Sequence, residues 1–376
     1  MNSLYIHIPF CKTRCGYCDF HSSTCFSNQG KYVSALCSEI KQRQDYLPSR
    51  SLATVYFGGG TPSLLSAQEI RCIFDCIKQY FTLEDECEIT MEMNPDDINH
   101  SYLTEIKNTG INRLSIGIQS FDNDDLKNIG RRHSAQKAID AVRLAQSLGF
   151  NNISIDLIFG LPFQDIDKWK KNLDTAFSLG IQHISSYALI YEEGTAFYDK
   201  MQKGIYTEVD DELSLEMYST LISEAEKNGF MHYETSNFAL PNLHSIHNSN
   251  YWSGNAYLGI GAGAHSYNGS CRQWNVSNND NYIKGIISEK PVCETETIDS
   301  ITAYNEYIMT GLRTMWGCDI EQLKERFGAE MLQFCIRCAT PYINSGQILI
   351  TENKMTIAKD AIFISDQIMS DLMWVE

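Results

Sequence analysis

Short β-rich runs alternate with longer amphipathic stretches over the first 230 residues of this 376-residue chain. Several runs are apolar throughout, which is typical of strands buried on both faces in parallel sheets covered by helices. The pattern predicts strands at 4–8, 54–58, 88–93, 113–118, 153–159 and 183–189. It predicts helices at 29–46, 66–80, 99–109, 134–148, 166–179 and 210–228.

The boundaries of these helices carry their own signals. Ser66 is followed three residues later by Glu69, which is a capping-box pattern at a helix start. Glycines follow four of the predicted helices, where a residue in the left-handed conformation often ends a helix. These glycines are Gly110, Gly149, Gly180 and Gly229.

Six βα units in succession predict an α/β fold, a partial TIM-type (β/α)6 barrel, with a doubly wound open sheet as the alternative. Polar or glycine-rich segments follow nearly every predicted strand, at residues 58–62, 93–97, 117–121 and 159–162 among others. The carboxyl ends of barrel strands surround one mouth, where active sites lie. A single site built from several of these loops therefore favours the barrel.

The pattern changes after about residue 230. Residues 232–239 and 257–267 predict further strands separated by a polar loop. A helical region at 302–314, 319–327 and 329–344 precedes a hairpin with its turn at 352–354 and a last helix at 363–374, typical of a small α+β, winged-helix-like domain. We expect a barrel over 1–235, a barrel extension over 236–290 and a C-terminal domain over 291–376.

Composition narrows the function. The formal net charge of −17 disfavours nucleic acid as a partner, since such proteins must neutralise phosphates. The chain has no apolar run near the ~20 residues of a membrane helix and no secretory signal, so we expect a cytoplasmic protein. In that reducing compartment, 13 cysteines indicate metal binding or catalysis rather than disulfides.

Three cysteines with the spacing C-x3-C-x2-C follow the first predicted strand directly: Cys11, Cys15 and Cys18. Iron–sulfur clusters are usually held by four thiolates, so three would leave one iron of a [4Fe–4S] cubane free to bind a ligand such as S-adenosylmethionine (SAM). A structural zinc site is the alternative, and such a site normally has four protein ligands. His7 and His21 flank the loop, and Cys25 is a conceivable fourth ligand.

Five segments extend this pattern: YIHIPFCKTRCGYCDF, YFGGGTPS, MEMNP, RLSIGIQSF and IDLIFGLP. Together they resemble the radical SAM family of anaerobic (oxygen-independent) coproporphyrinogen III oxidase and its relatives, over about residues 4–270. The resemblance implies SAM contacts at Tyr5, Tyr17, Gly59, Gly60, Thr61, Glu92, Gln119, Arg131, Asp156 and Ile190.

The residue types suit those roles. Glycines permit close approach of the backbone to a ligand, and arginine binds carboxylates through a bidentate fork. Glu92 and Asp156 end otherwise apolar strands, where a carboxylate needs a polar partner. A structural hydrogen bond is the alternative for these carboxylates and for Gln119, and a surface charge is the alternative for Arg131, which precedes Arg132.

Two branches of the family compete. The oxidase has a fourth cysteine where this chain has Phe20, and an N-terminal extension that is missing here. HemW-type haem chaperones lack both features and share an H-N-x-x-Y-W segment implicated in haem binding. The matching residues here are His247, Asn248, Tyr251 and Trp252, and His244 and His265 are alternative haem ligands.

The resemblance therefore implies a haem chaperone that binds haem and transfers it to an acceptor. The alternative is an oxidase that converts coproporphyrinogen III to protoporphyrinogen IX by oxidative decarboxylation, and another tetrapyrrole or small molecule is a third substrate class. Whether the chain is an enzyme stays open. A flavodoxin- or ferredoxin-type electron donor is the expected partner, and the resemblance allows a membrane haem acceptor. A last cysteine pair, Cys335 and Cys338, indicates core packing in a C-terminal helix.

Overall fold

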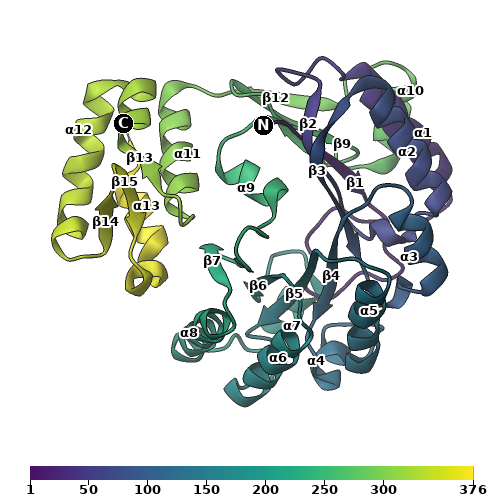
Figure 1. Ribbon diagram of the computed structural model, residues 1–376, viewed down its shortest axis with the longest axis horizontal. Coiled ribbons are helices and arrows are strands. Elements are labelled where there is room, and N and C mark those ends of the chain that lie inside the picture. Colours follow the sequence, from purple (N-terminus) through teal and green to yellow (C-terminus); the bar gives the residue numbers. More distant parts are fainter. Residues whose placement is uncertain (376) are drawn as a thin grey trace.

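A curved parallel sheet covered by helices forms the larger part of the structure, a computed structural model that describes residues 1–375 (Figure 1). Six strands pair in the order in which they occur along the chain: β1 (Ser3–Ile8), β2 (Ser51–Gly59), β3 (Thr82–Met93), β4 (Arg113–Gln119), β5 (Ile153–Phe159) and β6 (His183–Ala188). A seventh parallel strand, β9 (Tyr257–Ile260), pairs with the free side of β1.

Helices connect these strands on the outer side of the sheet (Figure 1): α1 (Gln29–Gln42), α2 (Ala67–Tyr80), α3 (His100–Lys107), α4 (Asn123–Asn128), α5 (Ala135–Ser147) and α6 (Ile166–Ser178). Helices α7 (Ala196–Gln202) and α8 (Asp211–Lys227) follow β6. The predicted elements are confirmed, although β3 starts earlier and α1 ends earlier than expected. The capping box of Ser66 and Glu69 is present, and the four predicted glycines have positive φ.

The sheet has twelve strands and stays open. The pair β7 (Met231–Glu234) and β8 (Asn237–Ala239) extends it beyond β6, and β10 (His265–Tyr267), β11 (Cys271–Asn275) and β12 (Cys293–Thr297) extend it beyond β9. Within residues 1–375, the edge strands β7 and β12 do not pair with each other. A partial barrel is therefore confirmed, and a doubly wound sheet, with its reversal of strand order, is excluded.

The strands are largely buried on both faces, as expected, but only one face is mainly apolar, and that part of the expectation was wrong. Alternate residues such as Leu4, Val55 and Ile116 pack in the core beneath the outer helices. The residues between them face the concave side and are mostly polar, among them Thr54, Tyr56, Glu88, Glu92, Arg113, Ser115, Asp156 and His183. The helices that connect β1 to β6 cover only the outer face, and the concave side holds a cavity and a polar network.

The predicted polar loop after β8 contains a helix, α9 (Ile246–Trp252), and this corrects the sequence interpretation. Helix α9 lies on the concave side of the sheet (Figure 1), near the amino ends of the strands. Ser245 caps its start by accepting a hydrogen bond from the backbone N–H of Asn248. The helix was missed because it is short, and its sequence is rich in Asn and Ser, which favour turns.

The C-terminal residues pack around a core of their own. This part contains α11 (Ser300–Leu312), α12 (Ile320–Asn344), β13 (Cys318–Asp319), β14 (Ile348–Thr351), β15 (Lys354–Ile357) and α13 (Ser365–Leu372). The backbone leaves the helical conformation at Gly328, where the sequence predicted a helix boundary, and Cys335 is buried in the core as expected. Helix α10 (Asn279–Ile287) and β9 share the barrel core instead. The domain limits at 235 and 290 stay predictions. Among residues 1–375, no helix combines the length and apolarity needed to span a membrane.

Candidate functional site

A cavity of about 540 Å³ opens at the carboxyl ends of the parallel strands. All six strands β1–β6 contribute to its wall, through the loops that follow them or, for β5, through the strand residues Asp156 and Ile158, as expected for a barrel site. The structure brings the three cysteines and nine of the ten predicted SAM contacts to this cavity: Cys11, Cys15, Cys18, Tyr17, Gly59, Gly60, Thr61, Glu92, Gln119, Arg131, Asp156 and Ile190. The tenth, Tyr5, does not line it.

The cysteine loop follows β1 and is fixed at both ends. The backbone N–H of Cys11 donates to the carbonyl of Ser23 at 3.0 Å, and the N–H of Cys18 donates to the carbonyl of Cys15 at 3.2 Å. In the middle, Gly16 lies against Phe197 of α7, so closely that a Cβ at this position would lie 2.6 Å from the ring. The fold therefore positions the loop that carries the three thiols.

The donor set fits a cubane with three protein ligands. Thr61 Oγ1 lies 3.5 Å from Cys11 Sγ and Arg131 Nη1 lies 3.6 Å from Cys15 Sγ, so polar donors face the sulfurs. Cys25 is exposed, contacts Ser27 and does not line the cavity. No three His, Cys, Asp or Glu side chains among residues 1–375 surround a single metal position. Three thiolates, each on a different iron, would leave the fourth iron of a cubane free, whereas a structural zinc site takes four ligands.

The glycine segment after β2 passes too close to its neighbours for any side chain. A Cβ at Gly60 would lie 2.8 Å from the carbonyl oxygen of Phe10, and Gly59 has φ 108°, where L-residues are strained. The N–H of Gly59 donates to Glu92 Oε2 at 3.1 Å. Both glycines line the cavity, so a ligand there can approach their backbone closely.

Two partly buried carboxylates face the cavity with neutral partners. Glu92 accepts hydrogen bonds from Gly59 and from the Tyr56 hydroxyl, the latter at 2.9 Å, and Asp156 accepts one from Ser115 at 3.2 Å. Burial, and secondly the charge of Asp156, raises the pKa of Glu92 to about 8, and burial also raises the pKa of Asp156. Both groups would be stabilised by a cation, and SAM carries an ammonium and a sulfonium.

Arg131 and Gln119 lie around Gly117, on the same side of the cavity as Asp156. Besides Cys15, Arg131 donates to the carbonyl of Gly117, whereas its neighbour Arg132 is exposed and pairs with Asp96. The backbone of Gln119 has φ 73° and bulges away from the register with β5. These contacts turn both side chains toward the cavity, and Arg131 is therefore not a surface charge.

The remaining predicted contacts differ in position. Tyr17 lines the cavity and packs edge-on against Phe197, while Ile190 lies at the rim and is 64% exposed. Tyr5 lies behind the wall, where its hydroxyl contacts His7 Nδ1 at 3.0 Å and its ring stacks on Tyr56.

Among the cavity-lining residues that the sequence interpretation missed are four polar side chains on strands: Tyr56, Ser115, Ser185 and Tyr187. The alternation of polar and apolar residues in the strands would have identified them.

The predicted haem segment lies apart from this cavity, on α9. His247 is buried, with 2% of its surface exposed, and both ring nitrogens are engaged. Nδ1 contacts the Thr54 hydroxyl at 2.7 Å and Nε2 contacts the Tyr251 hydroxyl at 3.0 Å. Burial, and secondly the charge of Arg113, lowers the pKa of His247 to about 3, so the ring is neutral at physiological pH.

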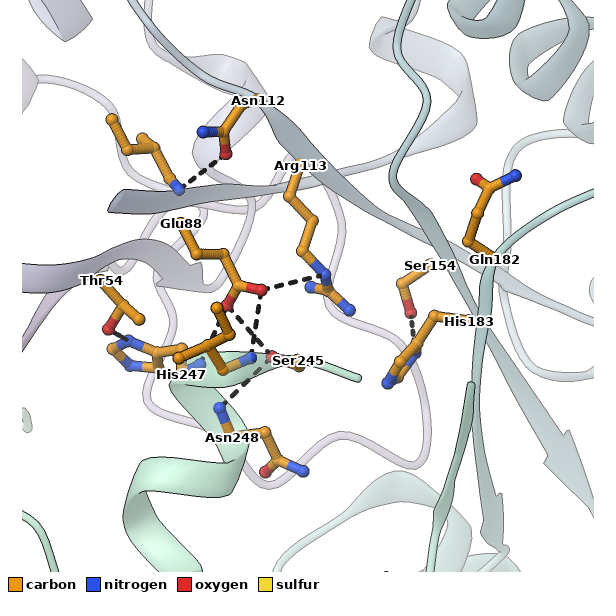
Figure 2. Close-up of polar contacts among 12 residues, drawn as sticks. Thr54, Glu88, Asn112, Arg113, Ser154, Gln182, His183, Ser245, His247 and Asn248 are labelled. Carbon is orange, nitrogen blue, oxygen red and sulfur yellow. Dashed lines mark hydrogen bonds and ion pairs between the residues drawn. The ribbon is translucent and has the colours of Figure 1, made fainter. Parts of the chain in front are cut away.

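A buried ion pair holds the start of α9. Glu88 accepts hydrogen bonds from the backbone N–H groups of Ile246, at 3.1 Å, and His247, at 2.9 Å. Arg113 Nε lies 3.8 Å from the same carboxylate, and Figure 2 shows Glu88 between Arg113 and the helix. A carboxylate at a helix amino end is stabilised by the exposed N–H groups and the helix dipole.

The rest of the segment faces β7 and the C-terminal part. Asn248 donates to the Tyr233 hydroxyl at 3.5 Å, and the Arg313 guanidinium lies 5.5 Å from the Trp252 ring centroid. The two alternative haem ligands lie elsewhere. His244 packs against the Tyr233 and Trp316 rings, and His265 is exposed beside Trp274.

Comparison with known proteins agrees with this geometry. Residues 5–189 match the radical SAM superfamily, which implies SAM and a [4Fe–4S] cluster as cofactors. The chain is 38% identical to the "Heme chaperone HemW" of Bacillus subtilis over 88% of both chains. It is 35% identical to that of Lactococcus lactis, over 87% of this chain and 85% of the relative.

A solved structure supports the fold. The chain superposes with a TM-score of 0.86 on coproporphyrinogen III oxidase (HemN) from Escherichia coli, at 20% identity, over 99% of this chain and 90% of that one. This likeness concerns the fold alone, whereas the HemW identities extend over most of both sequences. The chain therefore belongs to the radical SAM superfamily and, within it, to the family of the HemW heme chaperones.

Proposed function

We propose that this protein is a haem chaperone, which binds haem and passes it to an acceptor, and that its barrel holds a [4Fe–4S] cluster and SAM. The similarity to proteins named heme chaperones, at 33–38% identity over more than four fifths of this chain for several relatives, carries this proposal. The H-N-x-x-Y-W segment on α9 supports it, because imidazole binds haem iron and aromatic rings offer flat apolar surfaces.

Different residues of the cavity would hold the cluster and the parts of SAM. Cys11, Cys15 and Cys18 hold the cluster, which supplies an electron to SAM when both are bound. Gly59, Gly60 and Thr61 let the methionine part of SAM approach the backbone, and the carboxylates of Glu92 and Asp156 offset its positive charges. Arg131 and Gln119 bind polar groups of SAM, Tyr17 shields the cluster, and Ile190 contacts the adenine. Tyr5 does not reach the cavity, and it supports the site through its contacts with Tyr56 and His7.

Haem contacts α9 through His247, Asn248, Tyr251 and Trp252. Both ring nitrogens of His247 are hydrogen-bonded, so this residue can bind iron only after its contact with Thr54 or its contact with Tyr251 is broken. Haem binding by His247 therefore includes a rearrangement of α9.

Two partners complete the proposal. The cluster needs a one-electron donor of the flavodoxin or ferredoxin type, and haem needs an acceptor, for which a membrane protein is the candidate.

Oxygen-independent coproporphyrinogen III oxidation is the second candidate function, because the HemN fold extends over 99% of this chain. Phe20, however, occupies the position at which that enzyme has a fourth cysteine, and it is 65% exposed beside the cavity.

One anaerobic experiment separates the two functions. Cluster-loaded protein is titrated with haem, and a parallel sample receives SAM, a reductant and coproporphyrinogen III. We expect near-stoichiometric haem binding that weakens in His247→Ala, with no conversion of the porphyrinogen. Formation of protoporphyrinogen IX, or haem binding that is equal in His247→Ala and in the unchanged protein, would contradict this proposal. His100→Ala, on the outer helix α3, is the matched control.

A further inference from the structure

Tyr56 connects the cavity to the haem segment. Its side chain lines the cavity, and its hydroxyl donates to Glu92 Oε1 at 2.9 Å. Its ring stacks on His247, with the centroids 4.9 Å apart and the planes inclined by 30°. One rigid side chain therefore contacts both a predicted SAM ligand and the predicted haem ligand.

The groups around Tyr56 and Glu92 are tightly packed. Gly58 lies between the aromatic rings and the carboxylate, and a Cβ there would lie 2.8 Å from the Tyr56 ring and 2.9 Å from Glu92 Oε1. The other oxygen of Glu92 accepts the N–H of Gly59, which belongs to the predicted SAM-binding backbone. A ligand that fixes Glu92 also fixes the Tyr56 ring, because packed groups shift together rather than deform.

Helix α9 has a defined docked position below Tyr56. Both ring nitrogens of His247 are hydrogen-bonded, one to the Thr54 hydroxyl and the other to the Tyr251 hydroxyl. Asn250 donates to Ser3 Oγ at 2.8 Å, and Glu88 accepts a backbone N–H at the helix start. The docked His247 has no nitrogen free for iron. Haem coordination through Nδ1 requires loss of the Thr54 contact and thus selects a second, undocked position of α9.

We infer that SAM binding in the cavity and haem binding by α9 oppose each other, and that Tyr56 is the positioning residue that links them. The inference rests on the proposed function. The positive charge of SAM favours the ionised form of Glu92. An ionised carboxylate accepts a stronger hydrogen bond from the Tyr56 hydroxyl than a neutral one does. SAM therefore favours the docked His247, and by linkage haem weakens SAM binding by the same factor. SAM would thus promote the release of haem.

The test measures two affinities in the cluster-loaded protein under anaerobic conditions without reductant, so that SAM stays intact. Haem affinity comes from quenching of tryptophan fluorescence, with and without saturating SAM, and SAM affinity comes from equilibrium dialysis of labelled SAM, with and without haem. We expect SAM to raise the dissociation constant of haem about fivefold or more, and haem to raise that of SAM by an equal factor.

Two variants test the role of Tyr56 and the docked position of His247. Tyr56→Phe keeps the stacked ring and loses the hydroxyl, so SAM and haem are expected to change each other's dissociation constants by a factor of only about one. Thr54→Val frees Nδ1 of His247 without touching the cavity, and it should strengthen haem binding. Three results would overturn this inference and leave the proposed function standing. The first is that SAM does not change haem binding, and the second is that Tyr56→Phe keeps the mutual effect of SAM and haem on their dissociation constants. The third is that Thr54→Val binds haem more weakly. Absence of haem binding in every form would instead overturn the proposed function.

Discussion

The carboxylate of Glu88 accepts the backbone N–H of His247 at 2.9 Å, so a residue in the middle of β3 fixes the start of the proposed haem-binding helix. The pair lies almost wholly inside the protein, together with Arg113. This relationship connects the stability of the barrel to the position of α9.

Replacement of Glu88 by Ala is therefore expected to destabilise the protein by about 3 kcal/mol, because it leaves the Arg113 charge buried without its partner. Urea unfolding measures the loss. Glu86→Ala, at an exposed position of the same strand, should change the free energy of unfolding by less than about 0.5 kcal/mol. Equal effects of the two changes would contradict the role of Glu88.

Serine at Cys11, Cys15 or Cys18 is expected to abolish the cluster, because serine does not replace a thiolate ligand of iron. Iron and acid-labile sulfide per chain, measured after anaerobic reconstitution, should fall to near zero in each variant. Cys25→Ser is the control and should keep the cluster, since this thiol is exposed and lies outside the cavity wall. Loss of iron in that control would point to Cys25 as a fourth ligand.

Gly60→Ala is expected to cost about 1–3 kcal/mol and to weaken SAM binding, because its Cβ would meet the Phe10 and Ile8 carbonyl oxygens at 2.8 and 2.9 Å. Gly30→Ala offers a matched control in the first turn of α1, where a Cβ meets nothing within 4 Å. That change should be neutral or stabilise the helix by up to about 1 kcal/mol. Thermal unfolding and SAM dialysis test both variants.

Glu92 predicts a pH dependence of stability in the absence of SAM. Its pKa, about 8 in the folded protein, lies above the usual value of 4.5, so the folded state binds the proton more tightly than the unfolded state. The stability from this group is fully present below about pH 4.5 and is lost as the pH rises through about 8, with a slope of at most ~1.4 kcal/mol per pH unit.

Urea unfolding between pH 5 and 9 measures this dependence. The difference in stability between the unchanged protein and Glu92→Gln isolates the contribution of Glu92, since glutamine does not titrate in this range. A difference that stays constant over the whole range would show that Glu92 has an ordinary pKa.

Much of the fold and site was predictable from local patterns. Strand and helix periodicity, the capping box at Ser66 and the glycines at helix ends are properties of neighbouring residues, and they predicted the βα units correctly. The cysteine spacing and the GGGTP segment at residues 58–62 predicted the cavity wall for the same reason, because each lies in one short loop at a strand end.

Other features needed the tertiary structure. Helix α9 has a sequence that favours turns, and it forms because Glu88 and Thr54, about 160 and 190 residues earlier in the chain, hold its start and its histidine. The contact of Tyr56 with both Glu92 and His247 likewise joins three distant segments. The sequence by itself determined most of the elements and the chemistry of each loop. Only the curvature of the open sheet and the packing of α9 on its concave side decided which side chains meet there, since such contacts depend on packing between elements rather than on local preference.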